Sequence, residues 1–159
     1  MAPPRWLADE MVGRLARYLR LVGCDAVYAK GLADREILAR AERENRVILT
    51  RDRQLAQRAV HALLLTRPDI AGQWRAVRTA YPDVSDRVRP VRCTECNAPL
   101  HRVPPPVAHG PGSKVPWDRV DRGLALYQCE ACGHLYWEGS HTAAINARLA
   151  AWAEEPAPT

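Results

Sequence analysis

Two pairs of cysteines have the spacing of a metal-binding knuckle. Cys93 and Cys96 form the first pair and Cys129 and Cys132 the second, with two residues between the members of each pair. Asparagine or glycine follows each pair, and both tolerate a positive φ that turns backbone N–H groups toward the thiolate sulfurs. Because four thiolates in a tetrahedral set favour Zn²⁺, these residues predict a structural zinc site. Disulfides, a redox-active pair and an iron–sulfur cluster are the alternatives.

The two knuckles predict a zinc ribbon with a long insertion. The 32 residues between the pairs exceed the spacing of roughly 15–20 that is common in zinc ribbons. A proline-rich segment, 103–116, accounts for the extra length if it forms an external loop. His134 and His141 lie nearby and can compete for metal, although four cysteines already complete a tetrahedral site.

Three aspartates occupy equivalent places in the chain. Asp9, Asp34 and Asp52 each lie just beyond a short apolar run, or where the helix after such a run begins. In an open parallel sheet these places fall at the carboxyl edge, where ligands bind. Three carboxylates there repel one another unless a cation neutralises them, and their hard oxygen atoms suit Mg²⁺ or Mn²⁺. Such ions activate water and stabilise phosphoryl transfer. The alternative is that each aspartate only caps a helix.

Arginines lie beside these aspartates in the sequence. Arg14, Arg17 and Arg20 follow the first aspartate on one predicted helix, and Arg51 directly precedes the third. Guanidinium groups at the rim of an acidic metal site would bind phosphates and reduce the repulsion among the carboxylates. The same arginines can instead be solvated or form internal ion pairs.

The pattern around these residues predicts four strands that alternate with helices. The strands are expected at 6–8, 26–28, 47–50 and 62–65. The helices are expected at 11–22, at 35–44 with Asp34 as cap, directly after Asp52, and at 70–80. Strands and helices that alternate at this spacing indicate an α/β fold with a parallel sheet flanked by helices.

Composition and charge narrow the class of protein. The chain has 159 residues, of which 47% are hydrophobic and 26% charged, as in ordinary globular proteins. Its net charge is +5, with +6 in the first 89 residues and −1 in the rest, and a basic first part favours a polyanionic partner. There is neither an apolar run long enough to span a membrane nor a signal-peptide core, so a cytoplasmic location is expected.

The prolines and the cysteines suggest how the chain divides. We expect a sheet-containing domain over 1–89, bounded by a hinge near Pro82 and Pro90. A four-cysteine ribbon over 90–141 follows, then a helix over 142–153 and a disordered tail over 154–159.

Several motifs together resemble one known family. They are DEMVGRLARYLRLVG at 9–23, DREIL at 34–38, VILTRD at 47–52, RCTECNAPL at 92–100 and CEACGHLYWEGSH at 129–141. In this order they closely resemble the Mut-seven C-terminal RNase-domain family, over roughly residues 5–150. This resemblance implies a PIN-like nuclease fold with a zinc ribbon at its C-terminal end.

The resemblance implies a Mg²⁺- or Mn²⁺-dependent endoribonuclease. Its catalytic acids would be Asp9, Asp34 and Asp52, and Thr50 matches the hydroxyl position of the family's Thr-Arg-Asp element. Arg14, Arg17 and Arg51 would hold the RNA backbone, and the ribbon would orient or select the RNA. His141 belongs to the family's closing motif and would contact a phosphate, move a proton or join the ribbon to the sheet. The residues give no assignment for the fourth acid of a typical PIN site.

Other functions remain open at this point. A non-catalytic module that binds RNA or the ribosome would use the same basic surface and ribbon. A toxin-like nuclease would require a protein partner, an antitoxin, that this sequence does not reveal. The same acids also suit a phosphatase or a DNA nuclease, because an acidic metal site does not by itself select RNA.

Overall fold

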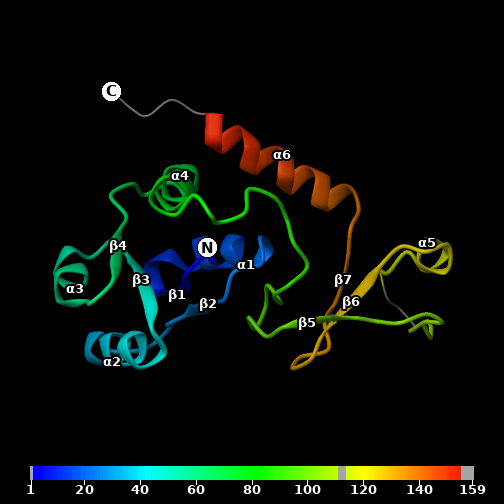
Figure 1. Ribbon diagram of the computed structural model, residues 1–159, viewed down its shortest axis with the longest axis horizontal. Coiled ribbons are helices and arrows are strands. Elements are labelled where there is room, and N and C mark those ends of the chain that lie inside the picture. The colour runs from blue at the N-terminus through cyan, green and yellow to red at the C-terminus, as the bar shows by residue number, and fades with distance from the viewer. Residues whose placement is uncertain (1, 111–113, 155–159) are drawn as a thin grey trace.

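The computed structural model describes residues 2–110 and 114–154. They contain a parallel sheet with the strand order β2-β1-β3-β4 and an antiparallel sheet with the order β5-β6-β7 (Figure 1). The parallel strands are β1 (Arg5–Ala8), β2 (Ala26–Tyr28), β3 (Arg46–Thr50) and β4 (Ala62–Leu64). The predicted α/β class is confirmed. Residues 155–159 of the predicted tail lie outside the described residues, and no described helix is long and apolar enough to cross a bilayer.

Helices cover both faces of the parallel sheet. One face carries α1 (Gly13–Leu21), α4 (Ile70–Ala80) and α6 (Ser140–Glu154), and the other carries α2 (Asp34–Glu44) and α3 (Arg53–Arg58). The pleat of β1 explains the division, because Trp6 and Ala8 pack on the first face and Leu7 packs on the second.

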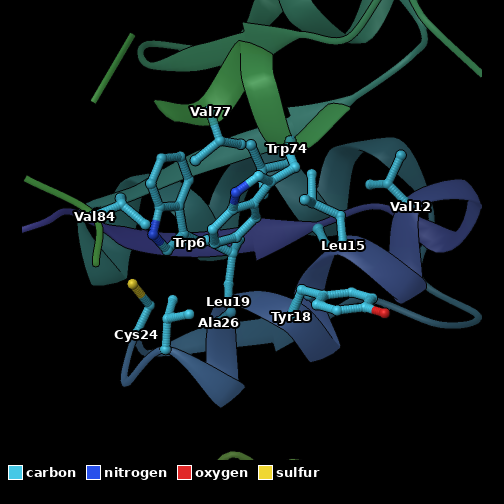
Figure 2. Close-up of a cluster of buried hydrophobic side chains, with 14 of the residues drawn as sticks. Trp6, Val12, Leu15, Tyr18, Leu19, Cys24, Ala26, Trp74, Val77 and Val84 are labelled. Atoms are coloured by element: carbon cyan, nitrogen blue, oxygen red, sulfur yellow. The ribbon is translucent and has the colours of Figure 1, made fainter. Parts of the chain in front are cut away.

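Two tryptophans form the centre of the larger core. Trp6 of β1 and Trp74 of α4 are both 0% exposed. Figure 2 shows them together, close to Leu15 and Leu19 of α1. Side chains of this size bury a large apolar area and fix both helices against β1. The end of β1, where Asp9 follows, is therefore firmly held.

Two helices begin differently from the prediction. The helix expected from residue 11 is divided into a 3-10 turn, η1 (Glu10–Val12), and α1. Asp34 is the first residue of α2 and not its cap. Ala33 takes the cap position, and its N–H donates to the Glu36 carboxylate at 2.8 Å. Glu36, and not Asp34, therefore supplies the carboxylate that accepts a backbone N–H at the start of α2.

The second sheet belongs to a cysteine module, which we define as residues 92–137. Its elements are β5 (Leu100–Arg102), α5 (Trp117–Asp121), β6 (Leu126–Cys129) and β7 (Leu135–Trp137). Val115, Val120 and Leu126 form its small core. Such a core buries little apolar surface, so a bound metal would add substantially to the stability of the module.

After the cysteine module, α6 returns to the first core (Figure 1). Leu149 is fully buried there, and Arg148 donates a hydrogen bond to the Tyr18 hydroxyl at 2.8 Å. The rings of Tyr18 and Trp152 meet edge to face, with centroids 4.9 Å apart. The helix predicted at 142–153 therefore extends over Ser140–Glu154 and packs with α1 and α4.

Asp25, just before β2, joins the cysteine module to the parallel sheet. Its carboxylate accepts hydrogen bonds from Arg46 at 2.7 Å and from the Asn97 side-chain amide at 2.8 Å. The side-chain oxygen of Asn97 in turn accepts the Ala26 N–H at 2.9 Å. The residue after the first cysteine pair thus binds the amino end of β2 through both of its polar side-chain atoms.

Arg20 of α1 provides a second link between the two parts. Its guanidinium donates to the carbonyl oxygen of Ala26 at 2.8 Å and to that of Thr94 at 3.0 Å. One of the arginines predicted to be solvated or phosphate-binding is therefore occupied by backbone carbonyls at the amino edge of the sheet.

Acid should weaken the Asp25 connection. Burial raises the pKa of Asp25, but hydrogen bonds from Arg46 and Asn97 outweigh burial and lower the pKa from 3.8 to about 2. Its contribution to the free energy of unfolding is therefore complete above about pH 4 and is lost as the pH falls toward about 2. We expect the free energy of unfolding, measured by urea denaturation, to fall between about pH 5 and pH 3 in both proteins. The fall should be about 1 kcal/mol smaller in Asp25→Asn than in the parent.

The exposed Asp86 supplies the control for this prediction. Asp86→Asn removes the same charge from a side chain that is 61% exposed. It should keep the parent's loss of stability between the two pH values. If all three proteins lose the same amount, Asp25 does not stabilise the fold through its charge.

Candidate functional site

The Thr50 hydroxyl connects the first and third predicted aspartates. It donates to the Asp9 carboxylate and accepts the backbone N–H of Asp52 at 2.9 Å. The other carboxylate oxygen of Asp9 accepts the Met11 N–H at 3.0 Å. Thr50 is 0% exposed and Asp9 is 7% exposed. The ends of the neighbouring strands β1 and β3 therefore meet at one buried hydroxyl.

Asp52 caps α3, as one of the sequence alternatives proposed. Its Oδ1 accepts the N–H groups of Gln54 at 2.8 Å and Leu55 at 3.2 Å. Its Oδ2 accepts no hydrogen bond from the described residues. Asp52 is also exposed. Capping and ligand binding are thus compatible, because the cap uses only one carboxylate oxygen.

Asp34 comes to the same edge of the sheet from the other side of β1. It follows the loop after β2, and the Ala29 N–H continues the pairing of that strand by donating to the Ala8 carbonyl at 2.8 Å. Asp34 lies in the first turn of α2, where it is exposed. A carboxylate in this position also interacts favourably with the helix dipole.

The three aspartates share an edge but do not form a tight cluster. Within the described ranges, only the four cysteines form a group of three or more Cys, His, Asp or Glu residues with ligand atoms within 4.8 Å of one another. No described basic side chain forms an ion pair with Asp9, Asp34 or Asp52. The buried Asp9 carboxylate thus has hydrogen-bond donors but no cationic partner in this part of the chain.

The predicted phosphate-binding arginines have different surroundings. Arg14 is exposed and has no side-chain partner among the described residues, whereas Arg17 pairs with Glu95 at 3.3 Å. Arg51 is half-buried, and within the described chain its buried Nε finds no hydrogen-bond acceptor. With Arg53 it lines a hollow of about 210 Å³ beyond β3 and β4.

His141 lies in the first turn of α6 and joins that helix to β7. Its Nε2 donates to the Trp137 carbonyl at 3.1 Å, and the two rings lie edge to face with centroids 5.9 Å apart. This contact fits the structural role that the sequence left open. His141 also lines a cleft together with Arg14 and Arg17.

This junction cleft, as we call it, has a volume of about 470 Å³. It is bounded by α1, residues 88–94, β7 and α6. Arg89 and Arg148 line it, although the sequence analysis did not identify them. No local pattern indicates them, because the fold brings Arg89 from the connecting segment and Arg148 from α6.

The four cysteines lie together as the knuckle spacing predicted. Their sulfur atoms all lie within 4.8 Å of one another, a cluster compatible with a structural zinc ion. Asn97 and Gly133 have φ values of 70° and 78°, so each knuckle makes the expected turn. The N–H groups of Ala131 and Cys132 lie 3.4 Å from the Cys129 sulfur.

The surroundings of Cys129 favour its thiolate form. Burial opposes ionisation, but the backbone N–H groups of Cys132 and Ala131 outweigh it and lower the pKa of Cys129 to about 6. Tyr136 places its hydroxyl 3.1 Å from the sulfur of Cys93. Hydrogen bonds of this kind orient thiolates around a metal and stabilise their charge.

Comparison with known protein families gives one finding. The family model described as the Mut7-C RNAse domain matches residues 4–149, which is nearly the whole chain. Neither the search of curated proteins nor the search of solved structures found a match.

The shared hydroxyl at the sheet edge can be tested by its removal. Thr50→Val leaves the Asp9 carboxylate and the Asp52 N–H each without one hydrogen bond. We expect the free energy of unfolding to fall by about 1–3 kcal/mol, measured by urea denaturation. Thr50→Ser keeps the hydroxyl and should lose clearly less. If Thr50→Ser loses as much stability as Thr50→Val, the hydrogen bonds of the hydroxyl contribute no more to stability than the packing of the methyl group.

Metal analysis tests the cysteine cluster. We expect the purified protein to contain one zinc ion per chain, and Cys132→Ser to lose it because one of four thiolate ligands is gone. Cys24 is buried outside the cluster, so Cys24→Ala serves as the control and should retain the zinc. A full complement of zinc in Cys132→Ser would contradict the assignment.

Proposed function

The chain belongs to the Mut7-C RNase domain family, and on that premise we propose that it is a metal-dependent endoribonuclease. The reaction is the hydrolysis of an RNA phosphodiester bond at the carboxyl edge of the parallel sheet. Water adds to phosphorus, the bond to the 3′ oxygen breaks, and that oxygen takes up a proton. The products carry 5′-phosphate and 3′-hydroxyl ends.

The Thr50 hydrogen bonds carry this proposal. Through one hydroxyl, Thr50 holds the Asp9 carboxylate and the backbone of Asp52 at the ends of adjacent strands. Rigid support of this kind is what a catalytic group needs, because small displacements of the group reduce its effect strongly.

The acids at this edge suit Mg²⁺ or Mn²⁺ by their chemistry. The Asp9 carboxylate is buried, and no cationic side chain of the described residues compensates its charge. A buried anion of this kind is costly unless it is paired, so the site favours a cation. Asp9, Asp52 and Asp34 would hold the ion, which would lower the pKa of a water molecule and stabilise negative charge at phosphorus.

The chain's own residues position the reacting groups. Asp9 is fixed by two hydrogen bonds, whereas Asp52 offers one carboxylate oxygen free of the helix cap. Arg51 stands beside Asp52, and Arg14 follows Asp9 in the first turn of α1. Their guanidinium groups would hold RNA phosphates on either side of the acids.

The cysteine module would take part in holding RNA. Its β7 and the adjoining α6 face α1 across the junction cleft, and His141 stands where they meet. A zinc ion at the four cysteines would stiffen this wall without entering the reaction, because four thiolates leave no open coordination position.

A non-catalytic RNA-binding module is the second candidate. The observation in its favour is that the three aspartates do not form a group within 4.8 Å in the described part of the chain. A protein of this kind would bind RNA through the same arginines and leave it intact.

Conservative replacement of the acids tests the proposal. Asn is also a good helix cap, so Asp52→Asn should keep α3 folded while it removes the charge. We expect Asp52→Asn and Asp9→Asn each to reduce the rate of RNA cleavage about 10²-fold or more, in an assay with and without Mn²⁺. The products should carry 5′-phosphates.

A matched variant completes this experiment. Asp118→Asn removes a charge from an exposed residue of α5 in the cysteine module and should cleave RNA like the parent. If both edge variants remain active, the acids are not the catalytic centre. If the parent binds RNA and leaves it intact with metal present, the protein is a binding module.

A further inference from the structure

We infer that the junction cleft binds one nucleotide of single-stranded RNA next to the bond that is cleaved. This inference rests on the proposed function and identifies part of its substrate site. It also makes the cysteine module and α6 direct parts of that site.

The size and walls of the cleft suit a nucleotide. Its volume of about 470 Å³ falls within the range of roughly 300–1,000 Å³ that is common for small-ligand sites. Apolar and aromatic side chains form part of its walls; they are Leu21, Ile145, Tyr136 and Trp137. Unpaired bases bind surfaces of this kind because every base has an apolar face that stacks on aromatic rings.

The walls of the cleft are held in place by hydrogen bonds. Asn146 of α6 accepts the Val88 N–H at 2.8 Å, which fixes the connecting segment against that helix. Tyr136 is fixed by its hydroxyl, which lies 3.2 Å from the Thr94 N–H. A site that is formed before its ligand arrives loses little conformational entropy on binding.

The charge of the cleft suits a phosphodiester. Five arginines line it, and Glu138 is the acid among the described lining residues. Arg17 and Arg92 lie near carboxylates, with Glu95 at 3.3 Å and Asp25 at 4.0 Å. The other three lining arginines have no carboxylate partner among the described residues; they are Arg14, Arg89 and Arg148. Guanidinium groups bind phosphate oxygens in a bidentate geometry.

The cleft runs along α1, which begins at the carboxyl edge of the sheet. Arg14, Arg17, Tyr18 and Leu21 line it with the spacing of one helix face. From Arg14 to Leu21 the helix rises about 10 Å. Arg14 lies in the first turn of α1 and Leu21 in its last turn, so the cleft extends from the end of the helix that follows Asp9 toward the amino edge of the sheet. A strand bound along α1 would therefore place neighbouring nucleotides in the cleft and at the acids.

Binding of a short single-stranded RNA tests this inference without cleavage. All proteins carry Asp52→Asn and are compared by fluorescence anisotropy with a labelled oligonucleotide. In this background, Arg14→Gln with Arg89→Gln should raise the Kd about tenfold at moderate salt. The slope of log K against log salt should become less steep by about 1.4, as expected for two lost contacts to single-stranded phosphates.

A control pair with the same change of charge lies on the other face of the sheet. Arg43 of α2 and Arg58 of α3 are exposed and have no ion-pair partner among the described residues. Arg43→Gln with Arg58→Gln should change the Kd less than about threefold. If the two pairs of substitutions weaken RNA binding equally, the RNA is attracted by net charge only and the inference is overturned.

Photo-crosslinking identifies the part of the RNA in the cleft. RNA that contains 4-thiouridine should crosslink to the β7 peptide with Tyr136 and Trp137, and mononucleotide should compete for this product where inorganic phosphate does not. Crosslinks confined to other segments, or unchanged binding by the cleft pair, would overturn the nucleotide site. The cleavage assay with Asp9→Asn and Asp52→Asn would still decide the nuclease proposal, so the two failures are distinguishable.

Discussion

The ion pair between the buried Arg46 and the half-buried Asp25 determines how the two parts of the molecule fit together. Arg46 lies at the amino edge of the sheet and also binds the Glu44 carboxylate and the Trp6 carbonyl. Buried charges are tolerated only when all their partners are supplied, and Asn97 of the cysteine module supplies one of them. The hydrogen bond from Asn97 to the Asp25 carboxylate therefore fixes the first cysteine knuckle against the parallel sheet.

The two edges of the parallel sheet differ in how their charges are compensated. At the amino edge, Asp25 meets Arg46, and backbone carbonyls receive Arg20. At the carboxyl edge, Asp9 and Asp52 have only neutral hydrogen-bond donors among the described residues. Electrostatic compensation is thus complete where the cysteine module attaches. At the carboxyl edge a bound ligand would supply the compensating charge, and this is the edge at which parallel sheets in general bind ligands.

Local features were predictable from the sequence, and features that depend on distant contacts were not. The four strands of the parallel sheet, α4 and the cap by Asp52 follow from short patterns, and the structure contains them, whereas β5, β6 and β7 were not predicted. The prediction of Asp34 as the cap was wrong, because Ala33 takes that position and donates its N–H to the Glu36 carboxylate. The junction cleft could not be predicted, because Arg89 and Arg148 come together at its walls only when α6 packs beside α1. The three aspartates were predicted at one edge of the sheet because strand ends define that edge, but the distances between them depend on loop geometry.

The return of α6 has a consequence for the order in which the protein matures. Tyr18 and Arg148 are separated by 130 positions, yet they share a hydrogen bond across the first core. A chain that emerges from the ribosome in sequence order forms the strands first and the cysteine module next, while the face of α1 waits uncovered. That face closes only when α6 emerges. The cleft therefore forms only after α6 has been made, and so after the cysteine module that supplies its far wall.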